Sequence, residues 1–272
     1  MRLSELGELG LLAELQRRGL AQRITNDAAE LDDGRILTQD ALVQDVHFKL
    51  GWISWRELGF RAAAVNLSDL AASGADADGL IVSLGAPGET ELDDIIELYE
   101  GMRETGVPVL GGDTTAADTV YLSVTAVGRS PRVPGRGGAQ PGDLIVVTGP
   151  LGGSGAAFRE QRFIRPPIRL DEGRELARTA HAMLDISDGL ERDLGHIAVR
   201  SGVRCVVELE RVPLAEGATF EDLGFGEDYE LLAAVPTEAF HVIGSCEEGE
   251  GVELLRHGLP VELGGWDHYR PR

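Results

Sequence analysis

The sequence has very little cysteine. Only Cys205 and Cys246 occur among its 272 residues, far apart and outside any Cys-x-x-Cys motif. A disulfide framework needs several paired cysteines, and a cysteine-based zinc site needs closely spaced ones. The sequence therefore supports neither class of protein and fits a reducing compartment.

Lysine is scarcer still. Lys49 is the only lysine, so arginine supplies the other 24 of the 25 basic residues. A Walker-type phosphate loop needs Gly-Lys-Ser/Thr, and a protein-kinase fold needs a lysine in a Val-Ala-Ile-Lys strand. No Gly-Lys occurs here, and Lys49 follows His47 and Phe48 instead. If the protein handles nucleotides, metal ions and arginines must supply the positive charge.

Basic residues as a whole are outnumbered by acidic ones. There are 46 Asp and Glu residues against 25 Lys and Arg, which gives a net charge of −21. Such a surface repels phosphate backbones and anionic lipids, so we expect neither nucleic acid nor membrane as a partner. The first residues, MRLSELGELG, are acidic where a signal peptide is apolar. No apolar run approaches the ~18–20 residues that span a bilayer. We expect a cytoplasmic protein.

Apolar patterning is present in both halves of the chain. It predicts helices over 4–18, 54–74, 91–103, 170–182 and 189–199, and strands over 35–38, 80–84, 107–110, 120–127, 144–147, 203–209, 229–235, 240–243 and 252–255. The mixture indicates an α/β or α+β fold. Residues 132–142 are rich in Gly, Pro and Arg, which is typical of a boundary. We therefore predict two domains, 1–138 and 139–272.

Acidic residues recur beside small or hydroxyl residues at the ends of apolar runs. The five clusters are Asn-Asp-Ala-Ala at 26–29, Thr-Gln-Asp at 38–40, Asn-Leu-Ser-Asp-Leu at 66–70, Gly-Gly-Asp-Thr-Thr at 111–115 and Asp-Ile-Ser-Asp-Gly at 185–189. Mg²⁺ prefers oxygen ligands, usually one or two carboxylates with water and a substrate phosphate. A single cluster is typical of a turn or a helix cap. Five together favour a multi-metal site that binds phosphates.

A glycine-rich run, Gly-Pro-Leu-Gly-Gly-Ser-Gly-Ala-Ala at 149–157, follows a predicted strand and opens a helix. Backbone N–H groups in such a run can cradle a phosphate. The run lacks both the G-x-G-x-x-G spacing and the Walker lysine, so a tight strand-to-helix turn is the alternative.

In their order along the chain, these motifs resemble those of the thiamine-monophosphate kinases, from the superfamily of aminoimidazole ribonucleotide synthetase. The matching strings are NDAA, TQDALVQDVHF, AVNLSDLAASGAD, LYEG, VLGGDTT, RGGAQPGD, VTGPLGGSGAA, LDISDGL, GEDYEL and GGWDHY. The resemblance implies two α/β domains, the first of which forms a homodimer through its sheet. It also implies that several Mg²⁺ ions hold ATP. The γ-phosphoryl group then passes directly to thiamine monophosphate, with no catalytic side chain forming a covalent intermediate.

The resemblance also assigns roles to residues. The implied metal ligands are Asp27, Thr38, Asp40, Asp69, Asp113, Asp185 and Asp188. The implied ATP contacts are Tyr99, Gly112, Arg136 and Ser187, and the implied contacts to thiamine phosphate are His47, Glu227 and Trp266. A site made of metal ligands and substrate contacts suits the reaction, because phosphoryl transfer depends mostly on positioning and charge neutralisation.

The sequence departs from the family at a few positions. The usual Gly-Asp-Asp reads Thr-Asn-Asp at 25–27, which removes a carboxylate at Asn26, and Gln39 replaces a threonine. The second half is also shortened. Two alternatives follow: another ATP-dependent synthetase of the superfamily, or a nucleotide-binding relative with weakened catalysis. The GEDYEL and GGWDHY strings count against the first, and the other acidic motifs count against the second.

Overall fold

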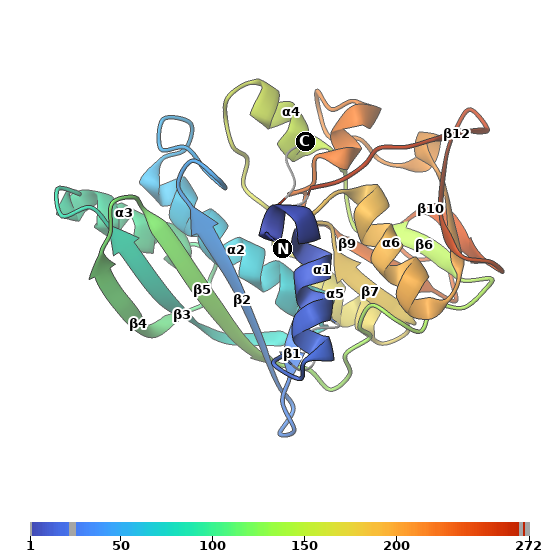
Figure 1. Cartoon of the computed structure of the whole chain (residues 1–272), viewed down its shortest axis with the longest axis horizontal. Coiled ribbons are helices and arrows are strands. Elements are labelled where there is room, and N and C mark those ends of the chain that lie inside the picture. Colours follow the sequence, from blue (N-terminus) through green and yellow to red (C-terminus); the bar gives the residue numbers. More distant parts are fainter. Residues whose placement is uncertain (1, 22–25, 267–268, 270–272) are drawn as a thin grey trace.

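The computed structural model describes residues 2–21, 26–266 and 269. Thr25, Asp267 and His268, which belong to the motifs above, lie outside the described residues. The chain forms two sheets with helices packed against them (Figure 1). This arrangement confirms the mixed α/β class.

The first half carries a five-stranded sheet in the order β1-β2-β5-β3-β4. β3 and β4 run parallel, and the other neighbouring strands are antiparallel. The elements of this half are α1 (Leu3–Arg17), β1 (Ala29–Glu30), β2 (Arg35–Val43), α2 (Trp55–Ala72), β3 (Asp76–Ala86), α3 (Leu92–Arg103), β4 (Val109–Ala116) and β5 (Tyr121–Arg129).

The second half carries a seven-stranded sheet in the order β12-β11-β8-β10-β6-β9-β7. Its elements are β6 (Leu144–Val147), α4 (Gly153–Arg159), α5 (Leu170–Ala177), β7 (Ala182–Asp185), α6 (Leu190–Ser201), β8 (Arg204–Glu208), η1 (Leu209–Arg211), η2 (Phe220–Gly224), β9 (Leu231–Val235), β10 (His241–Glu247), β11 (Gly251–Arg256) and β12 (Leu259–Val261).

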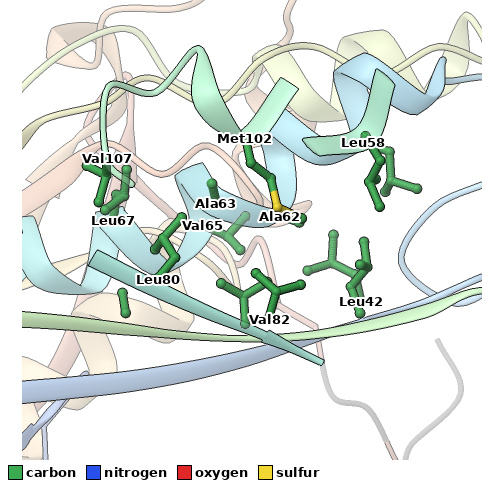
Figure 2. Close-up of a cluster of buried hydrophobic side chains, with 14 of the residues drawn as sticks. Leu42, Leu58, Ala62, Ala63, Val65, Leu67, Leu80, Val82, Met102 and Val107 are labelled. Atoms are coloured by element: carbon green, nitrogen blue, oxygen red, sulfur yellow. The ribbon is translucent and has the colours of Figure 1, made fainter. Parts of the chain in front are cut away.

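Helix α2 is the central element of the first half. Its start is capped by Ser54, whose hydroxyl oxygen accepts the Glu57 N–H at 3.2 Å. Such a cap satisfies one of the orphan N–H groups at a helix start. Helix α2 lies between the sheet and α3 and packs against both. Figure 2 shows this core, in which Leu80 and Val82 of β3 face the helix. Residues on alternate positions of β2 and β3 therefore face α2, and the others face away.

The two halves also pack directly on each other. Ala71 and Ala72 near the end of α2 belong to the same buried cluster as Leu176 and other residues of the second half. A Cβ on Gly173 would lie 2.2 Å from the Ala71 carbonyl oxygen, so helix α5 approaches α2 as closely as its backbone permits. Helix α1 lies across the front of both halves (Figure 1).

Some predicted elements differ from the structure. The helix predicted over 170–182 ends at Ala177, and residues from Ala182 form strand β7 instead. The strand predicted over 107–110 is β4, which runs from Val109 to Ala116. The apolar run that begins at Ala182 suits a buried strand as well as a helix. It forms strand β7 because it pairs with β9. Among the described residues, no helix is long and apolar enough to cross a membrane.

Candidate active site

A cavity of about 1130 Å³ opens between the two halves. Its walls include parts of α1, β2, α2, the loop after β7 and the segment before β9. Most of the predicted site residues line it: Asp27, Thr38, Asp40, His47, Asp69, Arg136, Asp185, Ser187, Asp188, Glu227 and Trp266. The fold thus gathers residues that are up to 239 positions apart in sequence, from 27 to 266.

Three carboxylates form a compact cluster at one end of the cavity. Asp27 precedes β1, Asp69 lies on α2 and Asp185 ends β7. One oxygen from each lies within 4.8 Å of the other two. The Ser68 hydroxyl donates to Asp185 at 2.5 Å, and the Thr38 hydroxyl donates to Asp69. We call these three carboxylates the acidic cluster.

The positive charge near the acidic cluster is too small to compensate its three carboxylates, so their pKa values are raised. Burial raises the pKa of Asp185 to about 7, and the neighbouring charge of Asp27 adds to the shift. Burial also raises the pKa of Asp69 well above its ordinary value, with Asp40 and Asp185 contributing. Buried like charges destabilise one another, so the cluster favours protons or a hard cation. Oxygen donors at this spacing fit Mg²⁺.

Strand β2 places Thr38 and Asp40 beside this cluster. Both lie on the strand face that carries the core residues Ile36 and Leu42 and looks toward α2. The Asp40 N–H donates to the Asn66 side-chain oxygen on α2 at 3.0 Å, which fixes the strand to the helix. The alternation of strand side chains therefore explains why both residues reach the cavity.

A second cluster consists of Asp188, Asp193 and His196, whose ligand atoms lie within 4.8 Å of one another. The Asp193 carboxylate accepts the N–H groups of Asp188 and Gly189 at 3.0 and 3.1 Å, so it caps the start of α6. Burial and nearby arginines lower the pKa of His196 to about 4, so its ring is neutral at pH 7. The sequence reasoning predicted only Asp188 of this group.

Arg136 and Asn26 adjoin the acidic cluster. The Arg136 Nε–H donates to Asp27 at 2.8 Å, so this guanidinium offsets one of the three carboxylates. The Asn26 side-chain oxygen accepts the Arg136 backbone N–H at 3.1 Å. Asn26 therefore holds the loop that carries Arg136.

Aromatic side chains line another part of the cavity, which we call its aromatic end. Trp52, Phe158, Phe163 and Phe225 all line it, and we call them the aromatic wall. Trp52 meets Phe158 edge-on at 5.4 Å between ring centroids, and Phe158 lies 5.0 Å from Phe225. The Lys49 ammonium lies 4.4 Å from the Trp52 ring centroid. None of these four rings was predicted from the sequence.

The three residues predicted to bind thiamine phosphate lie in the cavity. The His47 Nδ1 accepts the Val43 N–H at 3.0 Å, which fixes its ring. Glu227 forms an ion pair with Arg61 at 2.6 Å, and the Arg61 side chain is only 2% exposed. The Trp266 backbone N–H donates to the Asp188 carbonyl at 3.0 Å and ties the tail to the site.

Asp113 does not join the acidic cluster of its own chain. It pairs with Ser83, which pairs with Ser123, which pairs with Ala41 on β2. Three strand spacings separate Asp113 from β2, or about 14 Å. Residues that pair across a sheet share a face, so Asp113 lies on the face opposite to Asp40.

Gly112 and Tyr99 likewise do not line the cavity. Gly112 pairs with Val82, and a Cβ there would lie 1.8 Å from the Val82 carbonyl oxygen. Tyr99 lies on α3, half-buried against the core of the first half. Within one chain, the structure therefore does not bring these two residues or Asp113 to the predicted site.

The glycine-rich run at 149–157 is a tight turn. The Gly152 and Ser154 N–H groups donate to the Asp228 carboxylate at 2.8 and 3.4 Å. Gly152 adopts a φ of 81°, and Gly153–Ala157 are buried. The protein's own carboxylate occupies the place that a phosphate would take, so the tight-turn alternative holds.

Comparisons with known proteins place this chain in a family. The N-terminal domain of AIR synthase related protein matches residues 25–130, and its C-terminal domain matches residues 140–254. A thiamine-monophosphate kinase of Aquifex aeolicus is 33% identical over 99% of this chain and 100% of its own length. The chain belongs to the thiamine-monophosphate kinase family. The family member of Mycobacterium tuberculosis is 36% identical over 98% of this chain and 93% of its own.

Solved structures agree with the family assignment. The structure of AaThiL complexed with AMPPCP and TMP has a TM-score of 0.90 and 33% identity, covering 98% of this chain and 99% of that one. The hydrogenase maturation protein HypE shares the fold, with a TM-score of 0.69 at 20% identity over 95% of this chain and 97% of that one. The expected two-part fold of the thiamine-monophosphate kinase family is therefore confirmed.

Proposed function

We propose that this chain transfers the γ-phosphoryl group of ATP to the phosphate of thiamine monophosphate, giving thiamine diphosphate. The observation that carries the proposal is one cavity with an acidic end and an aromatic end. Carboxylates suit metal-bound phosphates, and aromatic faces suit the rings and the cationic thiazolium of thiamine. The AaThiL structure with AMPPCP and TMP supports the same pair of ligands.

The acidic end provides the proposed Mg²⁺ ligands. These are Asp27, Asp69 and Asp185, with Thr38, Asp40 and Asp188 beside them. Bound there, Mg²⁺ neutralises phosphate charge, which is the main electrostatic requirement of phosphoryl transfer. Arg136 keeps its contact with Asp27 and presents its remaining donors to a nucleotide phosphate, because a guanidinium has five N–H groups. Ser187 and Arg136 are the proposed nucleotide contacts within the cavity.

We place the boundary between the two domains at 138/139. The loop between β5 and β6 spans this position. The match to the N-terminal family model ends at residue 130, and the match to the C-terminal model begins at residue 140. Each domain contributes part of the acidic cluster, with Asp69 from the first and Asp185 from the second. The proposed reaction thus takes place where the domains meet.

We further propose that the protein is a homodimer in which the first sheet pairs with a second copy. Strand β4 forms the edge of that sheet, and nearly all of its residues are exposed. Ile81 on β3 is 43% exposed and Leu110 on β4 is 63% exposed. Apolar side chains exposed on the sheet and along its open edge form a surface suited to pairing. Asp113 and Gly112 lie on this strand and would complete the acidic end of the partner's cavity.

The activity test is incubation with Mg²⁺, ATP and thiamine monophosphate, followed by chromatography. We expect equal amounts of ADP and thiamine diphosphate. A phosphorylated or aminated ribonucleotide as the preferred acceptor would favour the synthetase alternative. ATP binding without product, at saturating Mg²⁺, would favour the weakened relative.

The dimer test uses two inactive variants, Asp40→Ala and Asp113→Ala, purified together as a heterodimer with different affinity tags. If Asp113 acts across the interface, one of the two sites is intact and the heterodimer has about half the wild-type activity. If Asp113 acts within its own chain, the heterodimer is inactive. Light scattering that gives a monomer mass at micromolar concentration would contradict the dimer itself.

A further inference from the structure

The segment 226–229 is held in an unusual backbone conformation. Gly226, Glu227 and Tyr229 have φ values of 84°, 59° and 53°. Residues other than glycine rarely adopt this left-handed region of φ, because it strains their backbone. Such strain persists only where the surrounding structure enforces it. The Glu227 N–H donates to the Ser187 carbonyl at 2.8 Å, and the Tyr229 N–H donates to the Ile186 carbonyl at 2.9 Å. The strained segment is thus fixed to the loop that follows Asp185.

Asp228 fixes the same segment from its other side. Its carboxylate is 94% buried and accepts the N–H groups of Gly152 and Ser154. With its own N–H, Asp228 and Tyr229 all anchored, Glu227 has little freedom in its backbone, and its side chain lines the cavity. The orientation of its carboxylate then depends on what that side chain contacts.

The Glu227 carboxylate contacts Arg61 on α2. The Arg61 Nη2 and a Glu227 oxygen lie 2.6 Å apart, with side-chain exposures of 2% and 25%. The guanidinium lies 5.2 Å from the Phe163 ring centroid and 5.8 Å from that of Tyr229. The Arg61 Nε is buried and has no hydrogen-bond partner among the described residues. Glu227 is therefore an ionic contact that compensates a deeply buried charge, and removal of Glu227 leaves the Arg61 charge buried without that partner.

We propose, on the basis of the function proposed above, that Arg61 is a positioning residue for the acceptor: it fixes the Glu227 side chain at the aromatic end of the cavity. Phe163, which contacts Arg61, lies 6.2 Å from Trp52 in the aromatic wall. Through Arg61, Glu227 is thus held next to the rings of the aromatic wall. A carboxylate in this position accepts N–H groups of a heteroaromatic acceptor and attracts its cationic ring, whereas it repels bare phosphate.

The test is the substitution Arg61→Met, which keeps much of the side-chain volume and removes the charge. We expect the KM for thiamine monophosphate to rise about tenfold to hundredfold, with kcat and the KM for ATP within about threefold of wild type. Arg61→Lys keeps the charge without the planar fork, so it restores part of the loss. The matched control is Arg165→Met, which removes an Arg–Glu pair with Glu57 and a ring contact with Phe60 outside the cavity.

A double-mutant cycle with Glu227→Gln isolates the route of the effect. If Arg61 acts through Glu227, the double variant has about the same KM for thiamine monophosphate as the worse single variant. Effects that multiply would show an independent action and overturn the proposal. Equal rises in both KM values with a lower melting temperature would show a structural role and also overturn it, and Arg61→Lys and Glu227→Gln decide the question if Arg61→Met does not fold. A wild-type enzyme without activity on thiamine monophosphate would instead contradict the proposed function.

Discussion

The two ends of the cavity are built from different parts of the fold. The acidic cluster comes mostly from helices and strands, because Asp69 lies within α2 and Asp185 ends β7, while Asp27 lies just before β1. The aromatic wall comes mainly from connections, since Trp52 precedes α2 and Phe163 follows α4. The acidic end works through charge, which requires fixed distances. The aromatic end works through contact area, which tolerates adjustment. Substitutions at the two ends should therefore fail in different ways.

The largest effect is expected at the acidic end. Asp40→Ala or Asp113→Ala removes a proposed metal ligand without removing core volume, so the fold should remain. Loss of several kcal/mol of charge stabilisation corresponds to a rate lower by at least about a thousandfold. Steady-state assays measure the rate, and circular dichroism checks the fold. Wild-type rates in either folded variant would refute its assignment as a metal ligand.

A smaller and more selective effect is expected at Trp266, which lines the cavity and is proposed to contact the acceptor. An indole face attracts a cation by roughly 0.5–2 kcal/mol. Trp266→Ala should therefore raise the KM for thiamine monophosphate from several-fold to tens-fold and change the KM for ATP much less. With Trp52 and Trp55 replaced by Phe, Trp266 fluorescence should respond to thiamine monophosphate and hardly to ATP. An equal rise of both KM values would instead show that Trp266 has a structural role and does not contact the acceptor.

The acidic end should also make the metal-free protein less stable as pH rises. The pKa of Asp185 is about 7 in the folded protein, against an ordinary value of 3.8. The folded state then binds more protons than the unfolded state between these values, so stability falls as pH rises through that window. The slope is up to about 1.4 kcal/mol per pH unit for each such group.

Thermal unfolding in a chelator at pH 5.5, 7 and 8 measures this effect. Asp185→Asn should flatten the dependence, because one of the titrating groups is gone. Saturating Mg²⁺ should flatten it as well, since the cation replaces the proton. An unchanged slope in Asp185→Asn would contradict the raised pKa.

The smallest effect is expected for Asn26→Asp, which restores the carboxylate common in the family. The new side chain keeps an oxygen for the Arg136 N–H, so the loop should hold. Added negative charge beside Asp27 should tighten Mg²⁺ several-fold at most, measured by titration of activity with Mg²⁺. A loss of activity would show that the uncharged side chain is required.

Local sequence patterns predicted the elements that carry their own signals. The helix predicted over 54–74 begins where the Ser54 hydroxyl caps α2, and the strand predicted over 120–127 is β5, in which burial alternates along the strand. The helix over 170–182 was predicted too long, because the apolar run at Ala182 suits either structure and only pairing with β9 decides it. Sequence reasoning cannot see such pairing.

The residues of the candidate site were likewise predicted where a local motif marked them and missed where only the fold brings them together. Motifs supplied the acidic residues because carboxylates beside glycine and serine are conspicuous. They could not show that Asp113 lies on the opposite face of the sheet from Asp40, which follows from strand order. Arg61 escaped notice because an arginine in a largely apolar helix is typical of a side chain that reaches solvent, and its burial depends on Glu227, 166 positions later in the sequence.

The position of Lys49 has a practical consequence for chemical labelling. It is the only lysine of the chain, and it lies in the cavity against Trp52. An amine-directed acylating reagent therefore has one side-chain target, apart from the terminal amine, and that target reports on the aromatic end. A single mass increment, read with and without each ligand, would footprint occupancy of the cavity without any engineered probe.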